Sequence, residues 1–254
     1  MRTSLLSSKR CLLALATAAS LSLGIAHAAI SAQEAERLGG ELTPLGGEKA
    51  GNADGSIPAW DGGLTVAPAG FTPGKHYVDP FPDDKPLFTI TAQNFEQYRD
   101  KLSDGQIAML NTYPQTLSYP VYQTRRTAAA PDWVYANTRK NATTATLVGG
   151  GNGFTNAYGG IPFPIPQNGV EAVWNHIARY RGTYLVRNLS EATVQANGAY
   201  NLSTFDQRVL FNYYIKDGDP AKLDNILFYY LASARSPARI AGQAALVYET
   251  LDQV

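Results

Sequence analysis

The chain has 254 residues, with 21 basic and 21 acidic side chains, and 44% of its residues are hydrophobic. This apolar content is enough for a buried core and excludes a globally disordered chain, and the formal charge of zero argues against a nucleic-acid partner. Charged residues make up only 17%, whereas glycine, proline and tyrosine are frequent, which favours strands, turns and long loops over a helical bundle.

The first 28 residues have the pattern of a secretory signal peptide. Three basic residues precede an apolar run over residues 11–26, and an Ala-His-Ala sequence ends at Ala28. Because this run is shorter than the ~20 residues of a membrane-spanning helix, we expect cleavage after Ala28 and no transmembrane span afterwards. Cleavage also removes Cys11, the single cysteine, so disulfides, zinc–thiolate sites and cysteine nucleophiles are excluded from the mature chain. We expect the mature protein in a bacterial periplasm, either free or peripherally bound at the outer membrane.

Residues 29–90 are predicted to form a Gly/Pro-rich N-terminal segment that wraps over the protein surface. The segment begins with a short helix over residues 31–38, in which Ser31 and Glu34 have the spacing of a capping box. Over residues 41–86 the frequent glycine and proline disfavour helices and central strands. Apolar side chains such as Trp60 recur throughout, which favours an ordered, docked segment over a flexible linker.

Residues 91–254 are predicted to contain helices followed by an antiparallel meander. Helices are expected over residues 91–110 (interrupted near Gly105), 132–147 and 169–180, a strand over 119–126, and an irregular proline-rich loop over 157–166. Strands are expected over residues 183–196, 200–216, 225–235 and 243–252. Since Asn197-Gly198 is a strong hairpin signal and the other connections are short, the sheet is antiparallel and the fold class is α+β. The last strand ends close to Val254, so we expect these residues to be part of one larger domain truncated at its C-terminus.

Three long stretches resemble the DUF1329 family of exported Gram-negative proteins. They are LTPLGGEKAGNADGSIPAWDGGL over residues 42–64, GGIPFPIPQNGVEAVWNHIARYRG over residues 159–182, and NILFYYLASARSPARIAGQAALVYETLDQV over residues 225–254. The resemblance covers the mature chain and implies that it corresponds to roughly the N-terminal half of a full-length member. No reaction is established for the family as a whole.

The same resemblance implies a fold and a class of partner. The family is similar to the periplasmic lipoprotein carriers of the LolA/LolB type, which form a curved, incomplete antiparallel β-barrel with helices at the open mouth of an apolar cavity. Its members are often named as outer-membrane lipoprotein-sorting proteins and tend to be encoded near export pumps of the resistance-nodulation-division type. It therefore implies a hydrophobic ligand or lipoprotein as cargo and envelope transport proteins as partners.

Aromatic side chains on the predicted strands are the candidates for a ligand cavity. They are Phe205, Phe211, Tyr213, Phe228, Tyr230 and Tyr248. One interpretation is a packed core, with tyrosine hydroxyls that reach water. The other is a sheet whose inner face holds an acyl chain, since burial of each CH₂ group contributes ~0.8 kcal/mol without specific polar contacts. The pattern of the residues leaves both interpretations open, and the resemblance favours the second.

A second cluster is polar and lies on the helix predicted over residues 169–180. It comprises Trp174, Asn175, His176 and Arg179. A structural role is favoured, in which Asn175 and His176 bond the proline-rich loop, and contact with a ligand is the alternative. The mature chain has only one other histidine, His76, and no nucleophile elbow, so neither a multi-histidine metal site nor a Ser-His-Asp triad is expected.

Three further motifs are better explained as turns than as sites. Residues 52–61 partly match a calcium loop, the acid pairs Asp83-Asp84 and Asp217/Asp219 could in principle serve a hydrolase, and residues 149–153 are rich in glycine. Asx and glycine are also the usual residues of turns, so we expect no metal and no cofactor. The leading hypothesis is a non-enzymatic binder or carrier of a hydrophobic molecule. The alternatives are a structural or interaction module of an envelope complex without a ligand cavity and, third, a hydrolase.

Overall fold

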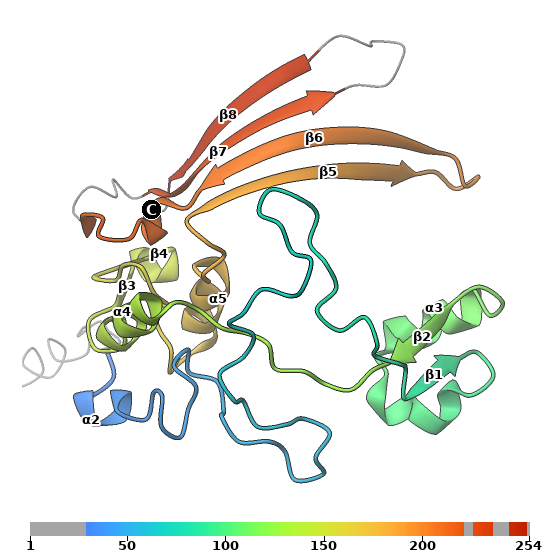
Figure 1. Ribbon diagram of the computed structural model, residues 1–254, viewed down its shortest axis with the longest axis horizontal. Helices are drawn as coiled ribbons and strands as arrows, with labels where there is room; N and C mark the ends of the chain where they lie inside the picture. Colours follow the sequence, from blue (N-terminus) through green and yellow to red (C-terminus); the bar gives the residue numbers. More distant parts are fainter. Residues whose placement is uncertain (1–28, 221–225, 236–243, 253–254) are drawn as a thin grey trace, which may run out of the picture. The chain divides into compact units, whose positions relative to one another are not determined.

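The computed structural model describes residues 29–220, 226–235 and 244–252 (Figure 1). Within these ranges, short helices are combined with three antiparallel sheets, so the chain is α+β, as predicted. None of the sheets in these ranges closes into a barrel. No helix in the described part of the chain is both long enough and apolar enough to cross a membrane. The predicted signal peptide, residues 1–28, lies outside the described residues.

The chain divides into two compact units. One consists of Met1–Leu38 together with Asp132–Val254, and the other of Gly39–Pro131. Most of the Gly/Pro-rich segment therefore belongs to the same unit as the helices and the small sheet that follow it.

The regular part of the unit Gly39–Pro131 is a two-stranded sheet with two helices. Its elements are β1 (Phe88–Thr91), the 3-10 helix η1 (Phe95–Lys101), α3 (Asp104–Thr112) and β2 (Ser118–Val121), in that order. β1 and β2 pair antiparallel, and Ile90, Phe95 and Leu110 form the small core beneath them. The interruption predicted within residues 91–110 is confirmed, but it precedes Gly105, because the Ser103 side chain caps α3 in a capping box with Gln106 and so starts a new helix.

The Gly/Pro-rich segment is ordered mainly by polar contacts. In residues 39–87 the only bridge is an isolated one between Leu42 and Glu48. The Arg126 guanidinium donates to four backbone carbonyl oxygens of the segment, those of Glu48, Lys49, Ala50 and Pro58. Trp60 Nε1 donates to the Ala128 carbonyl oxygen at 2.9 Å. Apolar docking is less complete than we expected, since the Tyr77 side chain is 84% exposed.

In its described residues, the helical layer of the other unit contains three α-helices and a small hairpin. Its elements are α2 (Ala32–Ala35), α4 (Asp132–Ala142), β3 (Thr146–Val148), η2 (Gly149–Gly151), β4 (Gly153–Thr155) and α5 (Gly169–Ile177). The prediction of a helix through residue 147 was wrong. α4 ends at Ala142 because Thr143 and Thr144 follow, and both side chains donate to the Lys140 carbonyl oxygen instead of continuing the helix.

The proline-rich loop over residues 157–166 is irregular, as predicted, and it lies against α4. Thr138 Oγ1 accepts a hydrogen bond from the Ile161 amide at 3.1 Å, and Asn141 Oδ1 accepts one from the Tyr158 amide at 3.1 Å. A Cβ atom added at Gly160 would lie 2.4 Å from the Thr138 amide nitrogen. Glycine is therefore required at this position, because the loop backbone touches the helix backbone.

The main sheet contains four long strands in the order β5-β6-β7-β8, each antiparallel to its neighbour (Figure 1). They are β5 (Tyr184–Val194), β6 (Tyr200–Leu210), β7 (Ile226–Arg235) and β8 (Ala244–Asp252). All four strands were predicted, and so was the turn at Asn197-Gly198, where Gly198 has a φ of 82° and Asn197 Oδ1 accepts from the Ala199 amide. β6, however, ends earlier than the predicted residue 216, and the 3-10 helix η3 (Asn212–Tyr214) follows it.

Candidate hydrophobic binding surface

The strand register determines which residues of β5 and β6 share a face of the main sheet. Tyr184 pairs with Leu210 and Val194 with Tyr200, whereas Leu189 pairs with Phe205. Because successive side chains of a strand point to opposite faces, the even-numbered residues of β5 and β6 share one face and the odd-numbered residues share the other. We call these the even face and the odd face.

The even face carries all the large apolar residues of β5 and β6 that are at least half exposed. They are Tyr184 (55% exposed), Val186 (58%), Val194 (68%), Tyr200 (61%) and Leu202 (50%). Val194, Tyr200 and Leu202 lie together at the hairpin end of the two strands, and we call them the hairpin patch. Tyr184 and Val186 lie at the other end and form the base patch. Burial of such side chains would be favourable, so both patches can bind a hydrophobic group.

The middle of the even face is polar. Ser190 and Thr204 are cross-strand partners whose hydroxyl oxygens are 2.9 Å apart, and Asn188 donates its side-chain amide to Asp206. These bonds satisfy polar groups that would otherwise interrupt an apolar surface. The two apolar patches are therefore separated within one copy of the chain.

The odd face is more covered than the even face. Val209 is 5% exposed and Gln207 is 7% exposed, and Phe205 is half-buried. Phe205 was predicted to line a cavity. It lies on the face opposite the exposed apolar patches, and Gln207, the next residue of β6 on that face, is buried.

Two other predicted cavity residues belong to the packed interior. Phe211 and Tyr213 follow the end of β6 rather than lying on it, and Tyr213 and Tyr214 are each 2% exposed. The Tyr213 hydroxyl donates to the Gly160 carbonyl oxygen at 2.7 Å, and its ring lies edge-on to Phe154 with centroids 5.7 Å apart. Burial raises the pKa of Tyr213 well above its ordinary value. These contacts make Tyr213 part of a core in which its hydroxyl is satisfied by the loop.

The remaining candidates, Phe228, Tyr230 and Tyr248, are placed by strand register alone, because the side chains of β7 and β8 lie outside what the structure describes. Tyr230 pairs with Val209, which puts it at an odd-face position, and Phe228 is two residues before it. Tyr248 pairs with Leu231, which in turn pairs with Arg208 at an even-face position. The predicted set is thus divided between the two faces.

The polar side chains of α5 bond separate parts of the chain and do not form a common site. The Trp174 indole nitrogen donates to the Gly151 carbonyl oxygen at 2.9 Å, while Asn175 donates to the Phe163 carbonyl and accepts from its amide at 2.5 and 2.9 Å. Both side chains therefore hold loops. His176 is exposed, and the Arg179 guanidinium donates to the carbonyl oxygen of His176.

The exposure of side chains along α5 does not follow their polarity. Val173 is 57% exposed, whereas Glu171 is 4% exposed. The Glu171 carboxylate accepts from the Gln167 amide at 2.6 Å and from the Asn168 side chain at 3.0 Å. These hydrogen bonds hold the first turn of α5 and satisfy the buried Glu171 carboxylate, while the apolar Val173 stays exposed.

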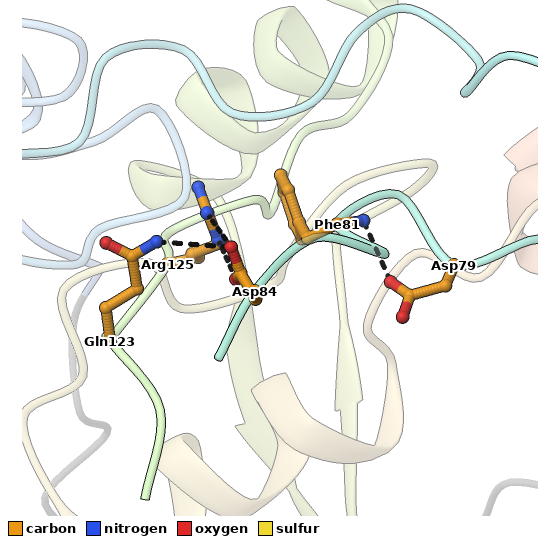
Figure 2. Close-up of polar contacts among 5 residues, drawn as sticks. All are labelled: Asp79, Phe81, Asp84, Gln123 and Arg125. Atoms are coloured by element: carbon orange, nitrogen blue, oxygen red, sulfur yellow. Dashed lines mark hydrogen bonds and ion pairs between the residues drawn. The ribbon is translucent and has the colours of Figure 1, made fainter. Parts of the chain in front are cut away.

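The acid pair Asp83-Asp84 does not have the properties of a general acid. Arg125 binds the Asp84 carboxylate with two hydrogen bonds of 2.8 and 2.6 Å, and Gln123 adds a third at 3.3 Å (Figure 2). The Arg125 guanidinium also lies 3.9 Å from the centre of the Phe81 ring. Hydrogen bonding from Arg125 lowers the pKa of Asp84, whereas a general acid needs a raised pKa. This cluster therefore anchors the Gly/Pro-rich segment to the irregular stretch of chain that follows β2.

In the loop with a partial calcium pattern, the candidate ligands close turns. Asp54 Oδ1 accepts from the Ser56 amide and hydroxyl at 2.9 and 2.7 Å, and Asn52 Oδ1 accepts from the Ile57 amide at 2.8 Å. Elsewhere in the described ranges, no group of three or more histidine, cysteine, aspartate or glutamate side chains is arranged to hold a metal ion.

Comparison with known proteins identifies the family. Residues 89–254 match the family described as "Protein of unknown function (DUF1329)". The chain belongs to the DUF1329 family. It is 52% identical over 227 residues to the uncharacterized protein PA3922 of Pseudomonas aeruginosa, an alignment that covers 89% of this chain and 50% of that protein. The chain thus spans about half the length of this curated relative, and no solved structure matches it.

The region matched to DUF1329 includes the whole main sheet, and with it both apolar patches. None of the five residues of these patches was predicted, because exposure depends on the face that a residue occupies and the predicted aromatic set was not divided by face. Alternation along β5 and β6, counted outward from the Asn197-Gly198 turn, would have grouped them correctly.

Proposed function

We propose that this DUF1329 protein is an exported, non-enzymatic binder or carrier of a lipid, a lipoprotein acyl chain or a similar hydrophobic molecule. The observation that carries the proposal is the even face of the main sheet, where five large apolar side chains are at least half exposed. A monomeric soluble domain rarely leaves such side chains in groups unless they bind something. The signal-peptide pattern of residues 1–28 supports a periplasmic location, where lipids and lipoproteins are moved between membranes.

The topology supports a relationship to the LolA/LolB carriers. A four-stranded antiparallel meander belongs to the same compact unit as α4 and α5. We propose that this sheet is the described part of a curved, incomplete barrel, to which further strands of a longer protein add. On this proposal an envelope transport protein delivers or receives the cargo.

The test compares ligand retention by variants with and without the hairpin patch. The delipidated full chain is incubated with radiolabelled palmitate or with a phospholipid extract, repurified and counted or examined by mass spectrometry. Val194→Asp and Leu202→Asp place charges in the hairpin patch and should abolish retention. Val66→Asp is the matched control, because Val66 is 75% exposed in the other unit and its replacement should retain the wild-type amount. Equal retention by all variants, or none by the wild type, would remove the proposal.

A second candidate function is an interaction module without a ligand cavity. It is favoured by the packed aromatic core around Tyr213 and Tyr214, which fills the space where a cavity was expected. A wild-type chain that retains no hydrophobe but is captured by an envelope protein through the even face would favour this second candidate.

A further inference from the structure

β5 is a long and regular edge strand. Within the described residues it pairs only with β6, and the 11 residues of β5 match β6 in continuous register without a bulge. It contains no proline and no lysine. Natural proteins usually protect sheet edges with those residues, with other charged side chains or with bulges. The only charged residues of β5 are Arg187 and Glu191, so this edge is suited to pairing with a strand whose charges complement them.

We propose that β5 pairs antiparallel with β5 of a second copy of this chain, about a two-fold axis at Leu189, to form a homodimer with a sheet continuous across the interface. Leu189 is the central residue of Tyr184–Val194, so this register lets the strands overlap over their full length. Any antiparallel pairing of a strand with itself places residues equidistant from the axis opposite each other.

The charges of β5 are self-complementary in this register. Arg187 and Glu191 lie two residues before and two residues after Leu189, so each Arg187 lies opposite Glu191 of the second copy. Both residues are exposed. Arg187 Nε donates to Gln207 Oε1 at 2.5 Å, and the two terminal guanidinium nitrogens are further donors that a carboxylate of the second copy can accept from. The symmetry repeats the ion pair, so the interface contains two cross-strand pairs of opposite charge.

The same register joins the apolar patches that are separate within one copy. Tyr184 lies opposite Val194 of the second copy, and Val186 lies opposite Ala192 of the second copy, all on the even face. The base patch of each copy thereby continues into the hairpin patch of the other, across Tyr200 and Leu202. An unrelated strand would not be expected to match both the charge spacing and the patch spacing about one central residue, which is why we assign a second copy as the occupant.

Charge reversal tests the register. The molecular mass of the full chain is measured by sedimentation over a range of concentrations. The wild type should dimerise. Arg187→Glu and Glu191→Arg should each weaken dimerisation at least roughly tenfold, because each puts two pairs of like charges across the interface. The double variant with both exchanges should dimerise like the wild type, because it restores two pairs of opposite charge. Arg208→Glu, an exposed residue of β6 away from the edge, is the control and should dimerise like wild type. A monomeric wild type, or single reversals without effect, would overturn the proposal.

Cysteine cross-linking tests the position of the axis independently. In a Cys11→Ser background, Leu189→Cys places two thiols across the axis, where paired strands hold Cα atoms at ~4.5–5.5 Å, within disulfide range. Oxidation should give a covalent dimer. Val194→Cys should not cross-link to itself, because its two copies would lie ~33 Å apart along the strands. Cross-linking of Val194→Cys but not of Leu189→Cys would show that the strands pair in another register. Neither experiment uses a hydrophobic ligand. The dimer can therefore be confirmed or refuted whether or not the protein binds a hydrophobic molecule.

Discussion

Replacement of Thr138 by valine tests how α4 holds the proline-rich loop. Thr138 is fully buried, and its hydroxyl donates to the Val134 carbonyl oxygen at 2.8 Å and accepts from the Ile161 amide at 3.1 Å. Valine has nearly the same shape but cannot accept a hydrogen bond. The Ile161 N–H would then lack its acceptor, and an unsatisfied buried donor reduces the free energy of unfolding by ~1–3 kcal/mol. We expect a loss near the middle of that range, because Ile161 is half-buried.

The assay combines urea unfolding with amide hydrogen exchange. In Thr138→Val the midpoint should fall at an unchanged slope, and the Ile161 amide should exchange faster than in wild type. Thr138→Ser is the matched control, since it keeps the hydroxyl and removes one methyl group, with an expected loss of ~1 kcal/mol. A Thr138→Val protein within ~0.5 kcal/mol of wild type, with Ile161 still protected, would refute the assignment of this bond as the main anchor of the loop.

Three further predictions concern glycine, arginine and tyrosine. Gly160→Ala should reduce the free energy of unfolding by ~1–3 kcal/mol and so lower the melting temperature in calorimetry, because the added Cβ would meet the Thr138 backbone. Gly169→Ala is the control and should not destabilise the protein, because nothing lies within 4 Å of the added Cβ. Arg126→Met removes the donor shared by four carbonyls, so limited proteolysis should cut the segment 48–60 faster than in wild type, and an unchanged rate would contradict the anchoring role. Burial raises the pKa of both Tyr213 and Tyr214 above 10.0, so the unfolded state loses these protons first and stability should fall as the pH rises above about 10. Tyr213→Phe should make that slope shallower by ~1.4 kcal/mol per pH unit, and an identical slope would argue against ionisation of Tyr213 as a cause.

Much of the secondary structure could be predicted because it depends on local chemistry. The four strands of the main sheet follow from β-favouring residues between turn dipeptides, and Asn197-Gly198 supplies the positive φ that the hairpin requires. The irregular loop over residues 157–166 follows from its alternating prolines, which cannot donate backbone hydrogen bonds. Such signals act within a few residues and do not depend on the rest of the chain.

The candidate site was less predictable because burial depends on distant partners. The end of β6 follows from contacts of Tyr213 with Gly160 and Phe154, more than fifty residues earlier in the chain. The burial of Glu171 has a different origin, because its carboxylate accepts from donors only three and four residues earlier, the Asn168 side chain and the Gln167 amide. Periodicity cannot represent such pairings.

The sequence by itself therefore determined the family resemblance, the α+β class and the order of strands and turns, because these depend on residue types and their neighbours along the chain. Only the tertiary structure decided which aromatic side chains fill the core and which apolar side chains stay exposed on the even face. The physical reason is that exposure of a side chain is set by what packs against it, and for Tyr213 and Val194 those neighbours come from other strands and loops.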